Sequence, residues 1–144
     1  MKHHLALMNI FFMRKILEGQ KTMETRWAKT KRTPFKSINK GDKIFFKEVG
    51  GNVKASAIVI KVEFHKKNEI ESTIDLFIKN HFREIGFDSK EQLNEFLLKK
   101  KDTNYLSIIW LDNLKNEFFK VDPKKYAYRN GWVVLNNILD IKYE

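Results

Sequence analysis

Apolar and polar residues alternate along several short stretches of this chain, as in strands that bury one face. The alternation and the flanking turn residues predict strands over 5–8, 21–27, 43–49, 53–65, 105–114, 117–121 and 131–136. In the long segment 53–65, Ala55, Ala57, Val59 and Lys61 share one face, and Ile58, Ile60 and Val62 share the other. In 21–27, one face carries Lys21, Met23, Thr25 and Trp27, and the other carries Thr22, Glu24 and Arg26.

Three other stretches have the apolar spacing of amphipathic helices. Asn9 as N-cap and Gly19 at the C-terminal end predict a helix over 9–18. A helix is predicted from about 70 to 85, ended by Gly86, and Ser89 opens a second inserted helix. This order of elements predicts an α+β fold, with about five to seven strands forming a barrel or curved sheet, in a single domain spanning 1–144.

The chain is basic, and its charge favours a polyanionic partner. Its 28 Lys and Arg against 18 Asp and Glu leave a formal net charge of +10, which points to nucleic acid first. Lysines dispersed over a solvated surface are the alternative explanation of this net charge, because composition alone does not show whether the basic residues gather in one patch.

Other features of the composition exclude several classes of protein. There is no cysteine, so disulfides and thiolate chemistry are excluded and the cytoplasm is the expected compartment. The four histidines lack the spacing of a metal site, and no cofactor motif occurs. No apolar run is long enough for a membrane span, and we interpret the N-terminus as folded structure rather than a signal peptide.

The segment GQKTMETRW, residues 19–27, is the best candidate for site chemistry. Lys21 could hold a phosphate or a carbonyl oxygen, or act as a base if desolvated; the alternative is a solvent-facing lysine. Glu24 and Arg26 share a strand face, so they form either a structural ion pair or a wall that binds a base and a phosphate. Ideal alternation places Lys21 on the opposite face, so convergence of all three requires a bend or bulge.

Further candidates combine aromatic and basic side chains. Such combinations suit single-stranded RNA, whose bases stack on rings while its phosphates meet cations. The alternative is an exposed loop with its tryptophan anchored in the core. The candidates are Trp27, Lys29, Lys31 and Arg32 in one run, with Lys47 and Arg129 as parts of further walls.

The motif Gly19-x-Lys21-x-x-Glu24-x-Arg26, followed by Gly41-Asp42 before a strand, resembles the ASCH domain (activating signal cointegrator homology) of the PUA-like superfamily. The segments KRTPF, EVGGNV and GWVVL resemble a bacterial branch of these proteins. The resemblance implies a small β-barrel whose cleft lies beside the first helix and is lined by the motif. It also implies that the partner is RNA or a modified nucleoside or nucleotide.

Some ASCH proteins are amidohydrolases acting on acylated cytidine, and others are ribonucleases. The amidohydrolase pattern has a hydroxyl residue three positions after the lysine, where this chain has Glu24, while Thr22 and Thr25 are out of register. The resemblance also implies a distant carboxylate, for which Glu63, Glu69 and Glu71 remain open.

The leading hypothesis is an RNA- or nucleotide-binding protein. The second is a hydrolase with Lys21 and Glu24 as catalytic residues. A third is a protein-interaction adaptor that uses the helix faces around Phe77 and Phe96.

Overall fold

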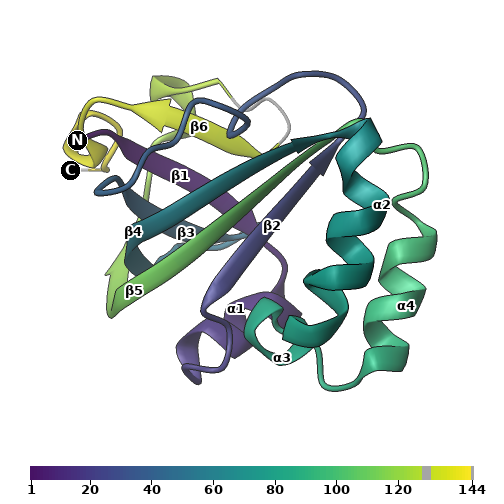
Figure 1. The fold of residues 1–144 in the computed structure, drawn as a ribbon. Coiled ribbons are helices and arrows are strands. Elements are labelled where there is room, and N and C mark those ends of the chain that lie inside the picture. Colours follow the sequence, from purple (N-terminus) through teal and green to yellow (C-terminus); the bar gives the residue numbers. More distant parts are fainter. Residues whose placement is uncertain (128–130, 144) are drawn as a thin grey trace.

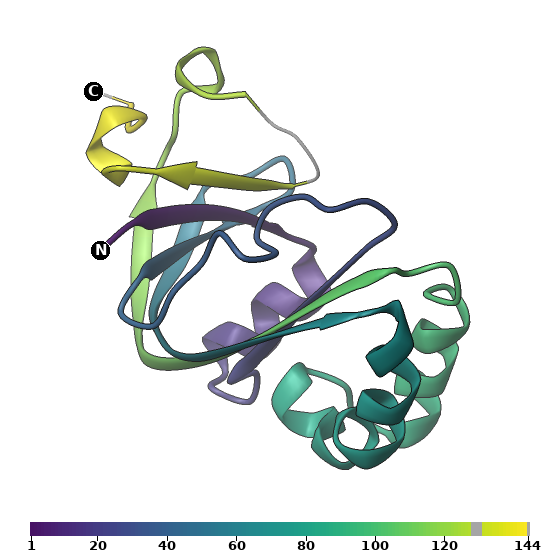
Figure 2. The same cartoon turned by 45° about the horizontal axis from the view of Figure 1, so that its top comes forward.

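The computed structural model describes residues 1–127 and 131–143. Its centre is a mixed sheet of six strands in the order β2-β5-β4-β3-β1-β6. Only β1 and β3 pair in parallel among the named strands; the other neighbours are antiparallel. The sheet curls into a half-barrel (Figures 1 and 2). The strands are β1 (His3–Met8), β2 (Met23–Ala28), β3 (Lys43–Glu48), β4 (Val53–Lys66), β5 (Tyr105–Phe119) and β6 (Trp132–Leu135).

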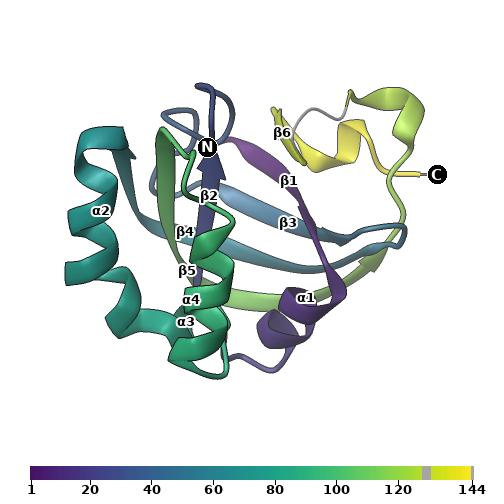
Figure 3. The same ribbon diagram turned by 90° about the vertical axis from the view of Figure 1, so that its right-hand side faces the viewer.

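The helices lie in two places around this sheet. Helix α1 (Ile10–Leu17) connects β1 to β2, and the inserted helices lie together beside β2 and β5 (Figure 3). The inserted helices are α2 (Lys67–Leu76), η1 (Ile78–His81), α3 (Phe82–Ile85) and α4 (Lys90–Leu98), and the short 3-10 turns η2 (Pro123–Lys125) and η3 (Ile138–Asp140) lie near the C-terminus. The α+β class and the barrel-like sheet predicted from the sequence are confirmed.

Helix α1 begins and ends at the residues that the sequence indicates. The side chain of Asn9 accepts a hydrogen bond from the backbone N–H of Phe12 at 2.9 Å, which satisfies one of the free donors of the first turn. Gly19 follows the helix with φ of 81°, a left-handed conformation that glycine adopts without a steric penalty. The helix therefore places Phe12 above the start of β2 and returns the chain to Lys21.

The described residues form three apolar clusters, of which two surround the candidate site and the third packs Leu5 and Phe45 against the C-terminal segment around Ile138. Met8, Met13 and Ile109 belong to the cluster inside the curl, together with Trp132. On the outer face, Met23 and Ile108 pack against the inserted helices, which contribute side chains such as those of Ile85 and Leu93. Because successive residues of a strand point to opposite faces, β5 contributes Ile109 to the inner cluster and Ile108 to the outer one.

The predicted helix over 70–85 is not continuous. Phe77 leaves the helical conformation, with φ of −131° and ψ of −58°, and separates α2 from η1 and α3. Its ring stacks on His81 at 4.0 Å and lies 5.6 Å from Trp110 of β5, measured between ring centroids. Packing of this ring on the sheet offsets the loss of helical hydrogen bonds at the break. The predicted stop at Gly86 is correct, with φ of 118°.

Two details of the strands also differ from the prediction. The strands predicted at 105–114 and 117–121 are one strand, β5, because β4 pairs with Lys115 and Asn116 across the interval. The pairing of β4 with β5 shifts between Val59 and Lys61, and the shift changes which side chains face inward. After it, Val62 and Phe64 pack on the inner cluster, so the prediction that Lys61 shares the face of Val59 is wrong.

Within the described residues, no helix has the length and apolar character needed to cross a membrane.

Candidate functional site

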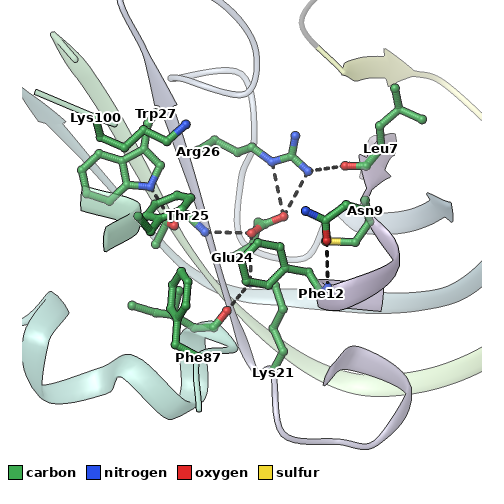
Figure 4. Close-up of a pocket in the computed structure, with 13 residues that line it drawn as sticks. Leu7, Asn9, Phe12, Lys21, Glu24, Thr25, Arg26, Trp27, Phe87 and Lys100 are labelled. Atoms are coloured by element: carbon green, nitrogen blue, oxygen red, sulfur yellow. Dashed lines mark hydrogen bonds and ion pairs between the residues drawn. The ribbon is translucent and has the colours of Figure 1, made fainter. Parts of the chain in front are cut away.

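A polar cavity of about 240 Å³ opens between β1, α1, β2 and the inserted helices. Its wall contains the charged residues of the motif together with several aromatic rings (Figure 4). The lining residues are Leu7, Met8, Asn9, Phe12, Lys21, Glu24, Thr25, Arg26, Trp27, Ile85, Phe87, Phe96 and Lys100.

Lys21 converges with Glu24 because it precedes β2 rather than belonging to it. The backbone N–H of Lys21 bonds to the carbonyl of Lys15 at 3.0 Å, and that of Thr22 bonds to the carbonyl of Glu84 at 2.8 Å. These contacts to α1 and α3 replace strand pairing at this point, so strand alternation does not apply to Lys21. The bend that convergence required is present, and the Lys21 Nζ lies 3.0 Å from Glu24 Oε1.

The ammonium group of Lys21 is buried and its three N–H groups each have an acceptor. Besides Glu24, the Nζ donates to the carbonyls of Met23 at 2.8 Å and Ile85 at 2.5 Å, and it lies 4.9 Å from the ring centroid of Phe12. The side chain is only 1% exposed. A lysine with three acceptors around it is held as a cation, because only the protonated amine supplies three donors.

Both carboxylate oxygens of Glu24 are saturated with donors. Oε1 accepts from Lys21 and from the backbone N–H of Thr25 at 3.0 Å. Oε2 accepts from Arg26 Nη2 at 3.1 Å and Nε at 3.3 Å. This predicted same-face ion pair therefore forms part of a buried three-residue network.

Burial and charge act in opposite directions on the pKa values of this network. Burial lowers the pKa of Lys21, and Glu24 opposes that effect. Burial alone would raise the pKa of Glu24, but Lys21 and Arg26 lower it below its usual range. Glu24 is therefore an anion that Lys21 and Arg26 neutralise. In this arrangement Lys21 has no free lone pair with which to accept a proton, so the geometry does not favour its action as a catalytic base.

Arg26 connects the two sides of the cavity, and one of its donor groups has no partner among the described residues. Its Nη2 also bonds to the carbonyl of Leu7 at 2.7 Å, which links edge strand β2 to β1 across the open side of the curled sheet (Figure 4). The guanidinium lies 5.0 Å from the ring of Trp132. Nη1 forms no hydrogen bond to any residue that the structure describes, and the side chain is 23% exposed.

The wall opposite α1 comes from residues that sequence reasoning missed. The ring of Phe87 lies 5.4 Å from that of Phe12 and 5.2 Å from that of Phe96, between centroids, and Phe96 also contacts Trp27. Lys100 adds a second cation beside Arg26 (Figure 4). Its position in a lysine run after α4 indicated only a favourable helix-dipole contact, so the sequence held no signal for its place in the cavity.

Burial lowers the pKa of Lys100, and repulsion from Arg26 adds to that effect. Lys100 has no ion-pair partner within residues 1–127 and 131–143.

The remaining predicted site residues are spread around this cavity rather than gathered in it. Trp27 lines it, while Arg32 lines a neighbouring hollow, and Lys29 and Lys31 line a third. Lys47 borders a separate hollow at the β3–β4 hairpin. Arg129 lies outside the described residues.

The carboxylates that the resemblance left open are not at the cavity. Glu63 pairs with Lys61 and His65, and Glu69 lies 3.8 Å from His65. Glu24 is the one carboxylate among the described residues that line the cavity. Thr25, which is out of register with the amidohydrolase pattern, does line it, and its hydroxyl accepts from the indole N–H of Trp27 at 2.9 Å. No three His, Asp or Glu side chains in the described part of the chain are grouped as metal ligands.

A buried hydrogen-bond chain supports Trp132, on which Arg26 packs. The Trp132 indole N–H donates to His4 Nδ1 at 2.9 Å, and His4 Nε2 lies 2.8 Å from Asp42 Oδ2. Since Nδ1 accepts, His4 is the neutral tautomer that donates from Nε2. Asp42 also accepts from the backbone N–H groups of Lys2 and Asn39, each at 3.0 Å. The Gly41-Asp42 motif is thus a structural anchor behind the cavity, and Trp132 is a buried core residue.

Solved structures with the same architecture include ASCH proteins from Zymomonas mobilis. A tyrosine-to-phenylalanine variant of ZmASCH superposes with a TM-score of 0.67, covering 96% of this chain and 93% of that one at 14% identity. The chain has the ASCH-domain fold. A serine-to-alanine variant of ZmASCH gives a TM-score of 0.65 at 14% identity, over 95% of this chain and 90% of that one.

Another structure of ASCH from Zymomonas mobilis gives a TM-score of 0.54 at 17% identity, over 80% of this chain and 70% of that one. No family model and no curated protein matches the sequence. At these identities the proteins share the ASCH fold.

Proposed function

We propose that this chain is a member of the ASCH family that binds single-stranded RNA, and that the cavity holds one nucleotide of the strand. The sequence motif and the shared fold support the family. The observation that carries the function is the charge of the cavity wall. Lys21, Arg26 and Lys100 face one carboxylate, Glu24, so two positive charges remain in excess.

Arg26 and Lys100 are the two cations at the cavity that are suited to a phosphate group. Arg26 Nη1 has no bond to a described residue, and Lys100 has no ion-pair partner among them. Arginine and lysine donate charge-assisted hydrogen bonds to phosphate oxygens. Bringing an anion between them also relieves their mutual repulsion.

The rest of the wall suits a nucleobase. The rings of Phe12, Phe87 and Trp27 offer aromatic surface, and base stacking on such rings tolerates any base because each has a π-face. Asn9 uses its Oδ1 to cap α1, which leaves its amide N–H groups as donors at the wall. The volume of about 240 Å³ lies below the range of roughly 300–1,000 Å³ for drug-sized ligands, and fits one nucleotide unit better than several.

The proposal is tested by fluorescence anisotropy with a labelled oligouridine at about 50 mM salt, where electrostatic binding is strong. Lys100→Gln removes one of the cations that line the cavity. At about 50 mM salt one contact with a single-strand phosphate contributes roughly eightfold to affinity, so the variant is expected to bind about eightfold more weakly than the parent.

The matched control is Lys99→Gln, which removes the same charge from the exposed neighbouring residue that does not line the cavity. It should bind within about twofold of the parent. No measurable RNA binding at low salt, or an equal loss in the two variants, would contradict the proposal.

A further inference from the structure

Two further hollows adjoin the cavity at the ends of three strands. A second hollow of about 190 Å³ shares Arg26 and Trp27 with the cavity, and a third of about 550 Å³ shares Tyr105 with the second. The end of β2, the end of β4 and the start of β5 meet there beside the first turn of α2 (Figure 1). The shared wall residues show that the three hollows adjoin one another in this order.

The walls of the second and third hollows are cationic. Arg26 and Arg32 line the second, while the third has four lysines, and no Asp or Glu lines either hollow among the described residues. The lysines of the third hollow are Lys29, Lys31, Lys66 and Lys67.

Most of this charge is available to a ligand. Arg32 bonds to the neutral hydroxyl of Thr30, so its charge is retained. Lys29 lies 3.8 Å from Asp102, but these side chains are 73% and 83% exposed, and an exposed pair of that kind contributes little. Glu69 is held by His65 and by the backbone N–H of Lys66.

Aromatic residues line the boundaries between neighbouring hollows. Trp27 lies between the cavity and the second hollow, and Tyr105 lies between the second and the third. The Tyr105 ring is held by Phe35 at 5.0 Å between centroids. Rings alternating with cations are the arrangement that binds single strands, because bases stack while phosphates follow the charge.

We propose that these hollows form an extended track for a single RNA strand, running from the cavity past Trp27 and Tyr105 to Lys66 and Lys67. This inference rests on the proposed function, since it takes the cavity as the first position of the strand. Its partner class is narrower: a single-stranded oligonucleotide several nucleotides long, rather than a free nucleotide.

The test compares two oligouridines, one of about three and one of about nine nucleotides, with the parent chain and a double variant. Lys66→Gln with Lys67→Gln removes two exposed cations from the far end of the track. Two single-strand phosphate contacts contribute about 25-fold at roughly 0.1 M salt, and about 1.4 units of slope in log affinity against log salt. We expect the double variant to bind the long strand about 25-fold more weakly than the parent does, and the short strand less than about twofold more weakly.

The matched control is Lys124→Gln with Lys125→Gln, an exposed Lys-Lys pair in η2 that lines none of the three hollows. It removes the same net charge, so equal losses in both double variants would show a general charge effect and overturn the track. Equal affinity of the parent for the short and the long strand would overturn it too, while leaving the cavity proposal standing. Failure of both strands to bind would instead reject the proposed function itself.

An unlabelled DNA strand of the same length serves as competitor. Competition as strong as that of RNA would show that the track reads a single-stranded backbone without selecting its sugar, and would overturn the assignment to RNA.

Discussion

Replacement of Lys21 by methionine tests whether this residue is a structural cation. Methionine has nearly the same length but no charge, so Lys21→Met leaves Glu24 buried with Arg26 as its remaining cationic partner. It also deprives the carbonyls of Met23 and Ile85 of the donor that they share. Removing one member of a buried ion pair costs about 3–5 kcal/mol.

We expect a loss near the lower end, about 3 kcal/mol in the free energy of unfolding, because Arg26 still compensates Glu24. For a chain of this size that corresponds to a fall in Tm of roughly 10 °C. Urea unfolding followed by tryptophan fluorescence measures it, with Lys99→Met, an exposed lysine, as control within about 0.5 kcal/mol of the parent. The double variant Lys21→Met, Glu24→Gln should be less destabilised than the sum of its single changes by at least about 1 kcal/mol, because it removes the uncompensated charge.

A Lys21→Met variant as stable as the parent would refute this reasoning. If that stable variant had also lost an RNA-cleaving or deacylating activity that the parent shows on RNA or acetylated cytidine, Lys21 would be a catalytic group, as the hydrolase interpretation requires.

Two further perturbations test the structure that supports the cavity. Burial lowers the pKa of His4, and its hydrogen bond and charge pairing with Asp42 oppose that effect. As the pH falls below about 6.5, the unfolded chain therefore binds more protons than the folded chain. The free energy of unfolding should then decrease with falling pH, by at most about 1.4 kcal/mol per pH unit. Urea unfolding at about pH 7.5 and 5.5 should show this slope, and His4→Gln should reduce it; an unchanged slope would mean that other groups cause it. Gly86→Ala should destabilise the chain by about 1–3 kcal/mol, because φ is 118° and the new Cβ would lie 3.0 Å from Cδ1 of Phe12. Thermal unfolding measures that loss, and a Tm equal to that of the parent would contradict the strain.

The sequence by itself determined the class of fold and the ends of several elements. Asn9, Gly19, Gly86 and Ser89 act locally, through caps and left-handed turns, so their positions could be read without tertiary information. The pairing of Glu24 with Arg26 was predictable for the same reason, since two positions along one strand place side chains on one face.

Only the tertiary structure decided where Lys21 points and what surrounds it. The backbone of Lys21 bonds to α1, the backbone of its neighbour Thr22 bonds to α3, and the Lys21 amine bonds to the carbonyl of Ile85. These partners lie outside the pairing ladder of β2, so no local pattern encodes them. The break at Phe77 and the union of two predicted strands into β5 have the same origin, because packing on the sheet and pairing with β4 override local preference. Lys100 lines the cavity because α4 packs beside β2. In the sequence, the same residue looks like an ordinary surface lysine.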